Sequence, residues 1–239
     1  MRERLKDIAV YCEGNHQKIK KMINSNQTVG SYQIDCDYVC MGDALYPKAL
    51  YDLEKPPFVL FYKGNIQLLE KKCISVVGSR YPSLYAKEMT HRLVDKLKKD
   101  YTIVSGLARG IDTIAHKSSL DFFTVAVLGC GIDVVYPHEN THLFKVMQEK
   151  QCIVSEYPPG VKPAKHYFPF RNRIIAALSP DLYVMSAALK SGTMTTVNEA
   201  LTLNRHVLVL PHPIDMKSGQ GCNQLIQEGA DILTSVDNL

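Results

Sequence analysis

The sequence predicts an α/β protein built on a mostly parallel sheet with helices on both faces, and three observations lead to this fold class. Short apolar runs recur along the chain, with segments of helical periodicity between them. Several runs are apolar without alternation, as in VLFY, VAVL and VLVL, which is typical of strands buried on both faces. Strands that alternate with helices favour parallel pairing, because each crossover helix returns the chain to the same edge of the sheet.

The elements follow in order. The expected strands are the apolar runs over Phe58–Tyr62, Cys73–Val77, Thr102–Val104, Thr124–Leu128, Cys152–Val154, Leu182–Met185 and His206–Leu210. The expected helices cover Leu84–Lys99, Gly110–Leu120, Thr141–Glu149, Asn172–Leu178, Thr193–Leu203 and Asn223–Glu228. In the fifth helix, Met194, Val197 and Leu201 fall on one face at helical spacing.

The chain before the first strand has a different composition. Residues 1–34 are polar and basic, and we expect a short N-terminal helical segment there, over about Leu5–Met22. A turn-rich stretch from Asp35 to Pro57 follows it. We therefore expect residues 1–34 as a short N-terminal segment and residues 35–239 as the core.

Composition narrows the class of protein. Of 239 residues, 46% are hydrophobic and 22% are charged, which are ordinary globular values. No apolar run approaches the roughly 18 residues that cross a bilayer, and the first residues lack the apolar stretch of a signal peptide. The seven scattered cysteines favour reduced thiols and a cytoplasmic location. Cys36 and Cys40 are four residues apart without a second pair, so we expect no metal.

The strand exits carry the candidate chemistry, because ligands of open parallel sheets bind beyond the carboxyl ends of the strands. Nearly every exit has Gly, Ser or a basic residue, in the segments 78–80, 105–112, 129–133, 155–160 and 190–193. Arg80, Arg109 and Lys190 add positive charge, and the set fits a phosphate-bearing ligand. The alternative is that these glycines serve only the short turns. The sequence contains neither G-x-x-x-x-G-K-[ST] nor G-x-G-x-x-G, which disfavours a P-loop NTPase and NAD or FAD binding.

The most informative stretch is residues 161–205, with six basic and two acidic residues. Its first part, KPAKHYFPFRNR, interleaves cations with aromatic rings. Single-stranded nucleic acid is held by cations on its phosphates and by rings under its bases. The alternative places Phe168 and Phe170 in the core and leaves the cations as a solvated face.

Signals for an enzyme are weak. Asp112 and His116 can face each other on one helix, but a stabilising pair or a buried, hydrogen-bonded His116 is favoured over a catalytic dyad. Glu156 precedes two prolines and is expected in a rigid turn. His138 and His142 lack a third ligand for a metal. We expect no catalytic residue.

Seven motifs in order carry a resemblance to a known family. They are GSR (78–80), SGLARGID (105–112), GCGIDVVYP (129–137), SEYPPG (155–160), FPFRNRIIAALS (168–179), KSGTMTTVNEAL (190–201) and GCNQLIQEGA (221–230). Together with YPKAL (46–50) and PPFVLFYKGN (56–65), they resemble the DprA/Smf family, the DNA-processing proteins of bacterial natural transformation.

The resemblance implies an extended Rossmann-like fold that binds single-stranded DNA without catalysis or cofactor. It further implies a cytoplasmic homodimer that protects incoming DNA and loads the RecA recombinase onto it during transformation and recombination. The DNA-binding residues that it implies, carried over by position, are Ser79, Arg80, Gly106, Arg109, Gly110, Lys165, Phe168, Arg171, Asn172, Arg173, Lys190, Ser191, Gly192 and Thr193.

Departures and alternatives remain. Many members of the family carry a C-terminal winged helix, and we expect none here, because the sequence ends at Leu239. A second hypothesis is an enzyme similar to nucleotide phosphoribohydrolases, whose motif reads GGxGTxxE. Gly192-Thr193 matches its GT, but Thr196 stands at the Glu position and Glu199 comes three residues later. A third hypothesis is a sensor of a small nucleotide at the same strand exits.

Overall fold

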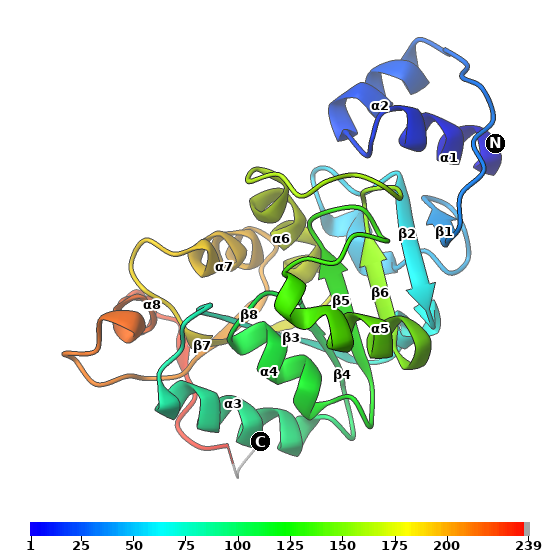
Figure 1. Ribbon diagram of the computed structural model, residues 1–239. Helices are drawn as coiled ribbons and strands as arrows, with labels where there is room; N and C mark the ends of the chain where they lie inside the picture. The colour runs from blue at the N-terminus through cyan, green and yellow to red at the C-terminus, as the bar shows by residue number, and fades with distance from the viewer. Residues whose placement is uncertain (237–239) are drawn as a thin grey trace.

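Nine strands form a single sheet in the computed structural model, which describes residues 1–236 (Figure 1). The order across the sheet is β1-β2-β6-β5-β4-β3-β7-β8-β9. The strands are β1 (Asp37–Cys40), β2 (Val59–Gly64), β3 (Cys73–Gly78), β4 (Thr102–Ser105), β5 (Thr124–Leu128), β6 (Cys152–Ser155), β7 (Asp181–Ser186), β8 (His206–Val209) and β9 (Asp231–Ile232). The strands from β6 to β9 in this order pair in parallel, whereas β2 pairs antiparallel with β6 and with β1. The predicted fold class, a mostly parallel Rossmann-like sheet, is confirmed.

Helices cover both faces of this sheet (Figure 1). They are α1 (Arg2–Tyr11), α2 (His16–Asn24), α3 (Leu84–Leu97), α4 (Ile111–Ser118), α5 (Thr141–Lys150), α6 (Tyr167–Ala177), α7 (Gly192–Thr202) and α8 (Gln220–Gln227). Short 3-10 helices cover Lys48–Asp52, Ile66–Glu70, His138–Asn140 and Lys217–Gly219. No helix within residues 1–236 is both long and apolar enough to span a membrane.

Alternate side chains of the central strands serve the two faces. Ile74 and Val76 of β3 pack with α3 and α4, in a cluster that includes Leu93 and Ala115. Val77 of the same strand belongs to the opposite cluster, which α6, α7 and α8 complete. Both faces of β3 are therefore buried, which explains why its sequence is apolar without alternation.

The seven predicted strands are all present, with ends that differ by at most two residues. The sequence analysis missed β1 and β9. The first of these lies in the turn-rich stretch and begins with Asp37, and the second is only two residues long. Neither has an apolar run long enough to predict a strand.

Two helix predictions were wrong in their bounds. The single helix expected over Leu5–Met22 is two helices, because Gly14 has a φ of +72° and Asn15 caps α2 by accepting a hydrogen bond from the Lys18 amide at 3.0 Å. The helix expected from Asn172 begins at Tyr167. Pro169 is compatible with that start, since the first helical turn tolerates proline.

The N-terminal helical pair, α1 and α2, packs against the edge of the sheet. Ile8 and Ile19 are buried in one apolar cluster with Val59 and Phe61 of β2. The turn between the two helices also contacts the core, since a Cβ on Gly14 would lie 2.6 Å from the carbonyl oxygen of Glu156. A domain boundary near residue 35 stays a prediction.

Candidate functional site

A groove of about 610 Å³ lies at the carboxyl end of β3. From β3 the chain runs outward through β4, β5 and β6, then crosses back to β7 on the other side of β3. This reversal is the switch point at which open parallel sheets bind ligands. We call this hollow the strand-exit groove. Its lining comes from the β3–α3 loop, the loop into α4, Tyr136, and the first turns of α6 and α7.

The strand-exit groove brings together most of the residues that the sequence analysis selected. Its lining includes Ser79, Arg80, Lys165, Phe168, Arg171, Asn172, Ser191, Gly192 and Thr193. Gly106 and Arg109 line a smaller side pocket of about 140 Å³, which shares Arg80, Phe168 and Arg171 with the groove. Gly110 lies against the backbone of Ser79 and Arg80. Arg173 and Lys190 are not part of either lining.

Arg80 and Lys165 are the exposed cations of the groove. The Arg80 guanidinium lies 5.9 Å from the centre of the half-buried Phe168 ring. The centre of the Tyr136 ring lies 5.2 Å from the centre of the same Phe168 ring. Positive charge and an aromatic surface therefore meet at one point of the groove. This combination suits a ligand that carries both phosphates and flat rings.

Arg171 is buried beneath the groove, with 5% of its surface exposed. Its guanidinium donates to the carbonyl of Gly106 at 2.8 Å and to the carbonyl of Val127. Burial lowers the pKa of Arg171, and the negative charge of Asp112 opposes this effect. The Asp112 carboxylate in turn accepts from the amides of Gly106 and Ala108, at 3.1 and 3.3 Å. Arg171 is therefore a fixed positive charge in the groove wall.

Two of the glycines at strand exits make room for protein side chains. A Cβ on Gly106 would lie 2.5 to 2.7 Å from the guanidinium atoms of Arg171. A Cβ on Gly129 would lie 2.8 Å from the ring of Phe168. These positions are glycine because Arg171 and Phe168 occupy the space in front of them, a reason that the sequence analysis did not consider.

The start of α7 supplies polar groups to the opposite wall. Ser191, Gly192 and Thr193 lie where the first amides of the helix have no partner within the helix. The Ser191 hydroxyl oxygen is buried and makes no hydrogen bond within residues 1–236. The side chain of Asn172 donates to the carbonyl of Gly192 at 3.4 Å, which links α6 to this turn. A hydroxyl and helix amides so placed favour an anion.

Arg109 is exposed at the side pocket, and its charge has a partner. Its guanidinium forms an ion pair with Glu139. A hydrogen bond with Tyr81 and the charge of Glu139 raise the pKa of Arg109. Compared with Arg80, Arg109 therefore offers less unpaired charge to a ligand.

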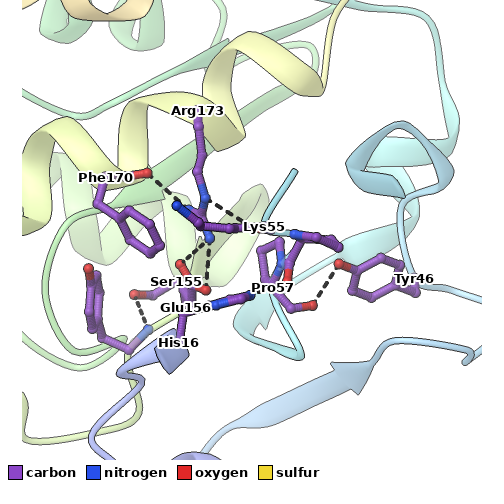
Figure 2. Close-up of polar contacts among 10 residues, drawn as sticks. His16, Tyr46, Lys55, Pro57, Ser155, Glu156, Phe170 and Arg173 are labelled. Carbon is purple, nitrogen blue, oxygen red and sulfur yellow. Dashed lines mark hydrogen bonds and ion pairs between the residues drawn. The ribbon is translucent and has the colours of Figure 1, made fainter. Parts of the chain in front are cut away.

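Arg173 is 4% exposed and points toward Glu156 and Lys55 (Figure 2). Its guanidinium contacts both carboxylate oxygens of Glu156, at 2.9 and 2.8 Å. It also donates to the carbonyls of Lys55 and Phe170 and lies 3.7 Å from the centre of the Phe170 ring. Arg173 thus joins α6 to the exit of β6 and to the loop before β2. Arg173 therefore has a structural role, since it connects these segments inside the protein.

The remaining acid and base candidates also have structural partners. Of the two structural alternatives for Asp112 and His116, the stabilising pair is not formed, since Asp112 bonds to the amides of Gly106 and Ala108. The other alternative is confirmed, since His116 is buried and its Nδ1 lies 2.7 Å from the Thr124 hydroxyl. Burial lowers the pKa of His116 to about 3. Among residues 1–236, no group of three His, Cys, Asp or Glu side chains is arranged to hold a metal ion.

The predicted DNA-binding residues did not include Tyr81, Tyr136 and Thr196, which also line the groove. Tyr81 is 75% exposed and directly follows Arg80. Tyr136 follows the exit of β5 (129–133), where an aromatic residue beyond the glycines was the available signal. Thr196 stands one turn into α7, on the same face as Gly192 and Thr193.

Fold and groove together define a Rossmann-like α/β protein with a cationic, aromatic site at its strand exits, a class that binds phosphate-bearing ligands. More particularly, the chain belongs to the family of DNA recombination-mediator protein A, the DprA/Smf family, whose sequence model matches residues 37–239.

Individual relatives agree with this assignment. Protein Smf of Synechocystis sp. is 38% identical over 238 residues, which cover 94% of this chain and 60% of that protein. DNA processing protein DprA of Streptococcus pneumoniae is 41% identical over 195 residues, which cover 81% of this chain and 69% of that protein. The chain thus spans less than two thirds of the cyanobacterial relative.

Solved structures of the family have the same fold. The X-ray structure of DprA from Streptococcus pneumoniae matches with a TM-score of 0.84 at 33% identity, over 98% of this chain and 94% of that one. DprA from Helicobacter pylori matches with a TM-score of 0.77 at 33% identity, over 84% of this chain and 93% of that one. The latter structure is described as giving insight into a single-stranded DNA binding mode of that protein.

Proposed function

We propose that this protein binds single-stranded DNA in the strand-exit groove, protects the strand and loads RecA recombinase onto it in natural transformation and recombination. The observation that carries this proposal is the meeting of Arg80, Lys165 and the Phe168 ring in one groove. Cations neutralise phosphates, and a ring under a base contributes about 1–3 kcal/mol of stacking. The single-stranded DNA binding of the Helicobacter pylori relative supports the same ligand.

The proposed role is binding without catalysis. Thr196 lines the groove at the position where the phosphoribohydrolase motif has its glutamate. The one carboxylate of the groove lining that the structure describes is Asp112, and it accepts hydrogen bonds from two backbone amides beside Arg171. Burial raises the pKa of Asp112, and the charge of Arg171 and the two amides oppose this effect. Because both amides bond to one of its oxygens, we assign Asp112 to holding the loop before α4 rather than to a reaction.

The proposal is tested by titrating a fluorescent single-stranded oligonucleotide against the wild type, Arg80→Ala and Lys165→Ala at several salt concentrations. Four phosphate contacts predict a slope of about −3 in log affinity against log salt. Each substitution should weaken binding, and the wild type should prefer a single strand to a duplex. Lys87→Ala is the matched control, since Lys87 is equally exposed on α3 outside the groove lining.

Two results would contradict the proposal. The first is that the wild type shows no affinity for oligonucleotides at low salt. The second is that a mononucleotide displaces the fluorescent strand as well as an unlabelled oligonucleotide does. The second result favours the nucleotide-sensor hypothesis. The RecA step is measured separately, as the rate at which RecA assembles on a single strand with and without this protein.

We also propose a homodimer that acts in the cytoplasm. Ile214 and Leu189 are 91% and 50% exposed and line one shallow hollow beside α8. Large exposed apolar side chains that gather in this way are typical of an interface. Light scattering should give twice the chain mass, and Ile214→Glu should give the monomer. A monomeric wild type at micromolar concentration would contradict this.

A further inference from the structure

The exposed face of α2 is strongly basic. Residues 14–34 contain three lysines and a histidine and no acidic residue. Lys18, Lys20 and Lys21 are all exposed, and none of them forms an ion pair with another of residues 1–236. The fold does not require these three cations, because exposed like charges three residues apart on a helix, such as Lys18 and Lys21, repel each other and slightly lower its stability. We call Lys18, Lys20 and Lys21 the α2 lysine face.

Neutral hydrogen-bonding groups accompany this charge. Gln17, Asn24 and Ser25 are exposed and form a shallow hollow together with Lys20 and Lys21. The side-chain amides of Gln17 and Asn24 can donate to phosphate oxygens and to base edges alike, whereas the Ser25 hydroxyl donates to the carbonyl of Lys21. An acidic peptide needs only the cations, whereas a nucleic-acid strand uses both kinds of group. The composition of the hollow therefore favours a nucleic-acid strand.

The α2 lysine face lies close to the strand-exit groove. The ring of His16, the first residue of α2, stacks on Phe58 at 4.7 Å and meets the edge of Phe170 of α6 at 6.4 Å. Figure 1 shows α2 beside the segment that leads into α6. The opposite side of α6 carries Phe168 and Arg171 to the groove. The start of α6 and the buried side of α2, which carries His16, thus lie between the two surfaces.

Exposed cationic and aromatic side chains continue across the start of α6. Lys165 lines the groove, and the exposed His166 follows it. The ring of Tyr167 lies 4.4 Å from that of His166 and 4.2 Å from that of Tyr157. On the far side, Lys20 is close enough to His16 to lower the pKa of His16, though burial and Arg173 contribute more. Lys165, His166 and Tyr167 therefore continue from the groove toward α2, where Lys20 is near His16.

We propose that the α2 lysine face is a second segment of the nucleic-acid surface: a single strand held in the groove passes over the start of α6, and its phosphates then contact Lys18, Lys20 and Lys21. This inference rests on the proposed function. It predicts that the site is longer than the groove alone, so a short strand fills the groove and only a longer strand reaches α2.

The test compares oligonucleotides of about 6 and about 25 nucleotides, within and beyond the length that one such groove holds. The full chain is compared with the triple variant Lys18→Glu/Lys20→Glu/Lys21→Glu. The short strand should bind both proteins equally. The long strand should bind the variant about tenfold more weakly or worse, and the salt slope should flatten by about 2, since each lost phosphate contact removes about 0.7.

The matched control is Lys72→Glu/Lys117→Glu/Lys150→Glu, which makes the same change in net charge at exposed positions by the amino ends of the strands. This control should bind each strand with the affinity that the wild type shows for it, apart from a small effect of net charge. If the α2 variant binds the long strand as the control does, the inference is overturned and the proposed function stands. If the wild type binds neither strand, the proposed function itself fails.

Discussion

At the scale of single residues, Arg171 and Arg173 lie two positions apart on α6, are both buried and have different tasks. Arg171 lies under the groove, where the negative charge of Asp112 stabilises its positive charge. Arg173 is held by both oxygens of Glu156 on the other side of the helix. Position in the RNR motif predicted a DNA contact for both. The structure indicates that substitutions at the two positions will fail in different ways.

We expect Arg173→Met to lower the free energy of unfolding by about 3–5 kcal/mol, because Glu156 would be left buried without its partner. Urea unfolding measures this loss. The double variant Arg173→Met/Glu156→Leu should recover most of it, since no buried charge remains. The folded fraction of Arg173→Met should bind oligonucleotides nearly as the wild type does. Unchanged stability with lost binding would return Arg173 to the interface.

Sequence alone could place the charges but not their partners. Arg80, Lys165 and Phe168 follow from composition and from their position after strands, and the structure collects them in one groove. The pairing of Arg173 with Glu156 joins positions 17 residues apart on different elements. Only the folded chain brings these two side chains together, so no local pattern could distinguish Arg173 from Arg171.

At the scale of elements, the seven apolar strands were predictable because burial on both faces forces a continuous apolar run. The edge strands β1 and β9 were not predictable from the sequence. They are strands because they pair with β2 and β8, and their composition does not indicate a strand. β9 consists of Asp231 and Ile232, both exposed, and pairs with β8. His206, the first residue of β8, links β9 to the neighbouring strands. One of its ring nitrogens lies 3.0 Å from Asp181 of β7, and the other contacts Asp231 of β9.

This contact predicts a pH dependence. The hydrogen bonds to Asp231 and Asp181 raise the pKa of His206 above its ordinary value of 6.5, although partial burial opposes them. The folded chain therefore keeps the proton to higher pH than the unfolded chain. The resulting stability is complete below pH 6.5 and is lost as pH rises through the raised pKa. Because the side chain is half exposed, the effect is small.

His206→Gln should flatten the change in melting temperature between pH 6 and pH 8, relative to the wild type. An NMR titration of the His206 ring should give a midpoint above 6.5 in the wild type. A midpoint at or below 6.5 would contradict the role of the contact.

At the scale of the whole molecule, the N-terminal helical pair and the sheet share one apolar cluster. Ile8 of α1 is 1% exposed and lies in the same cluster as Phe61 of β2 and Met147 of α5. A unit that buries its apolar face on the sheet cannot unfold without exposing the sheet as well. The pair should therefore belong to the cooperative unit of the fold.

We expect Ile8→Ala to lower the free energy of unfolding of the entire chain by about 2–5 kcal/mol, in a single transition. Differential scanning calorimetry measures both the loss and the number of transitions. Leu84→Ala, at a position that is 82% exposed and outside the proposed dimer surface, is the control and should change stability by less than about 0.5 kcal/mol. A separate low-temperature transition in Ile8→Ala would show that the pair unfolds on its own.

The burial of Arg171 against Gly106 has a consequence for recognition. A free arginine side chain has about 2 kcal/mol of rotamer entropy, which it loses when it is immobilised. Arg171 has already lost this entropy on folding, because two carbonyls and Asn172 hold its guanidinium. Lys165, exposed at the rim, loses its own each time a ligand arrives. The groove thus combines a preorganised cation, Arg171, with an adaptable one, Lys165. Ligand binding costs ordering entropy at Lys165 but not at Arg171.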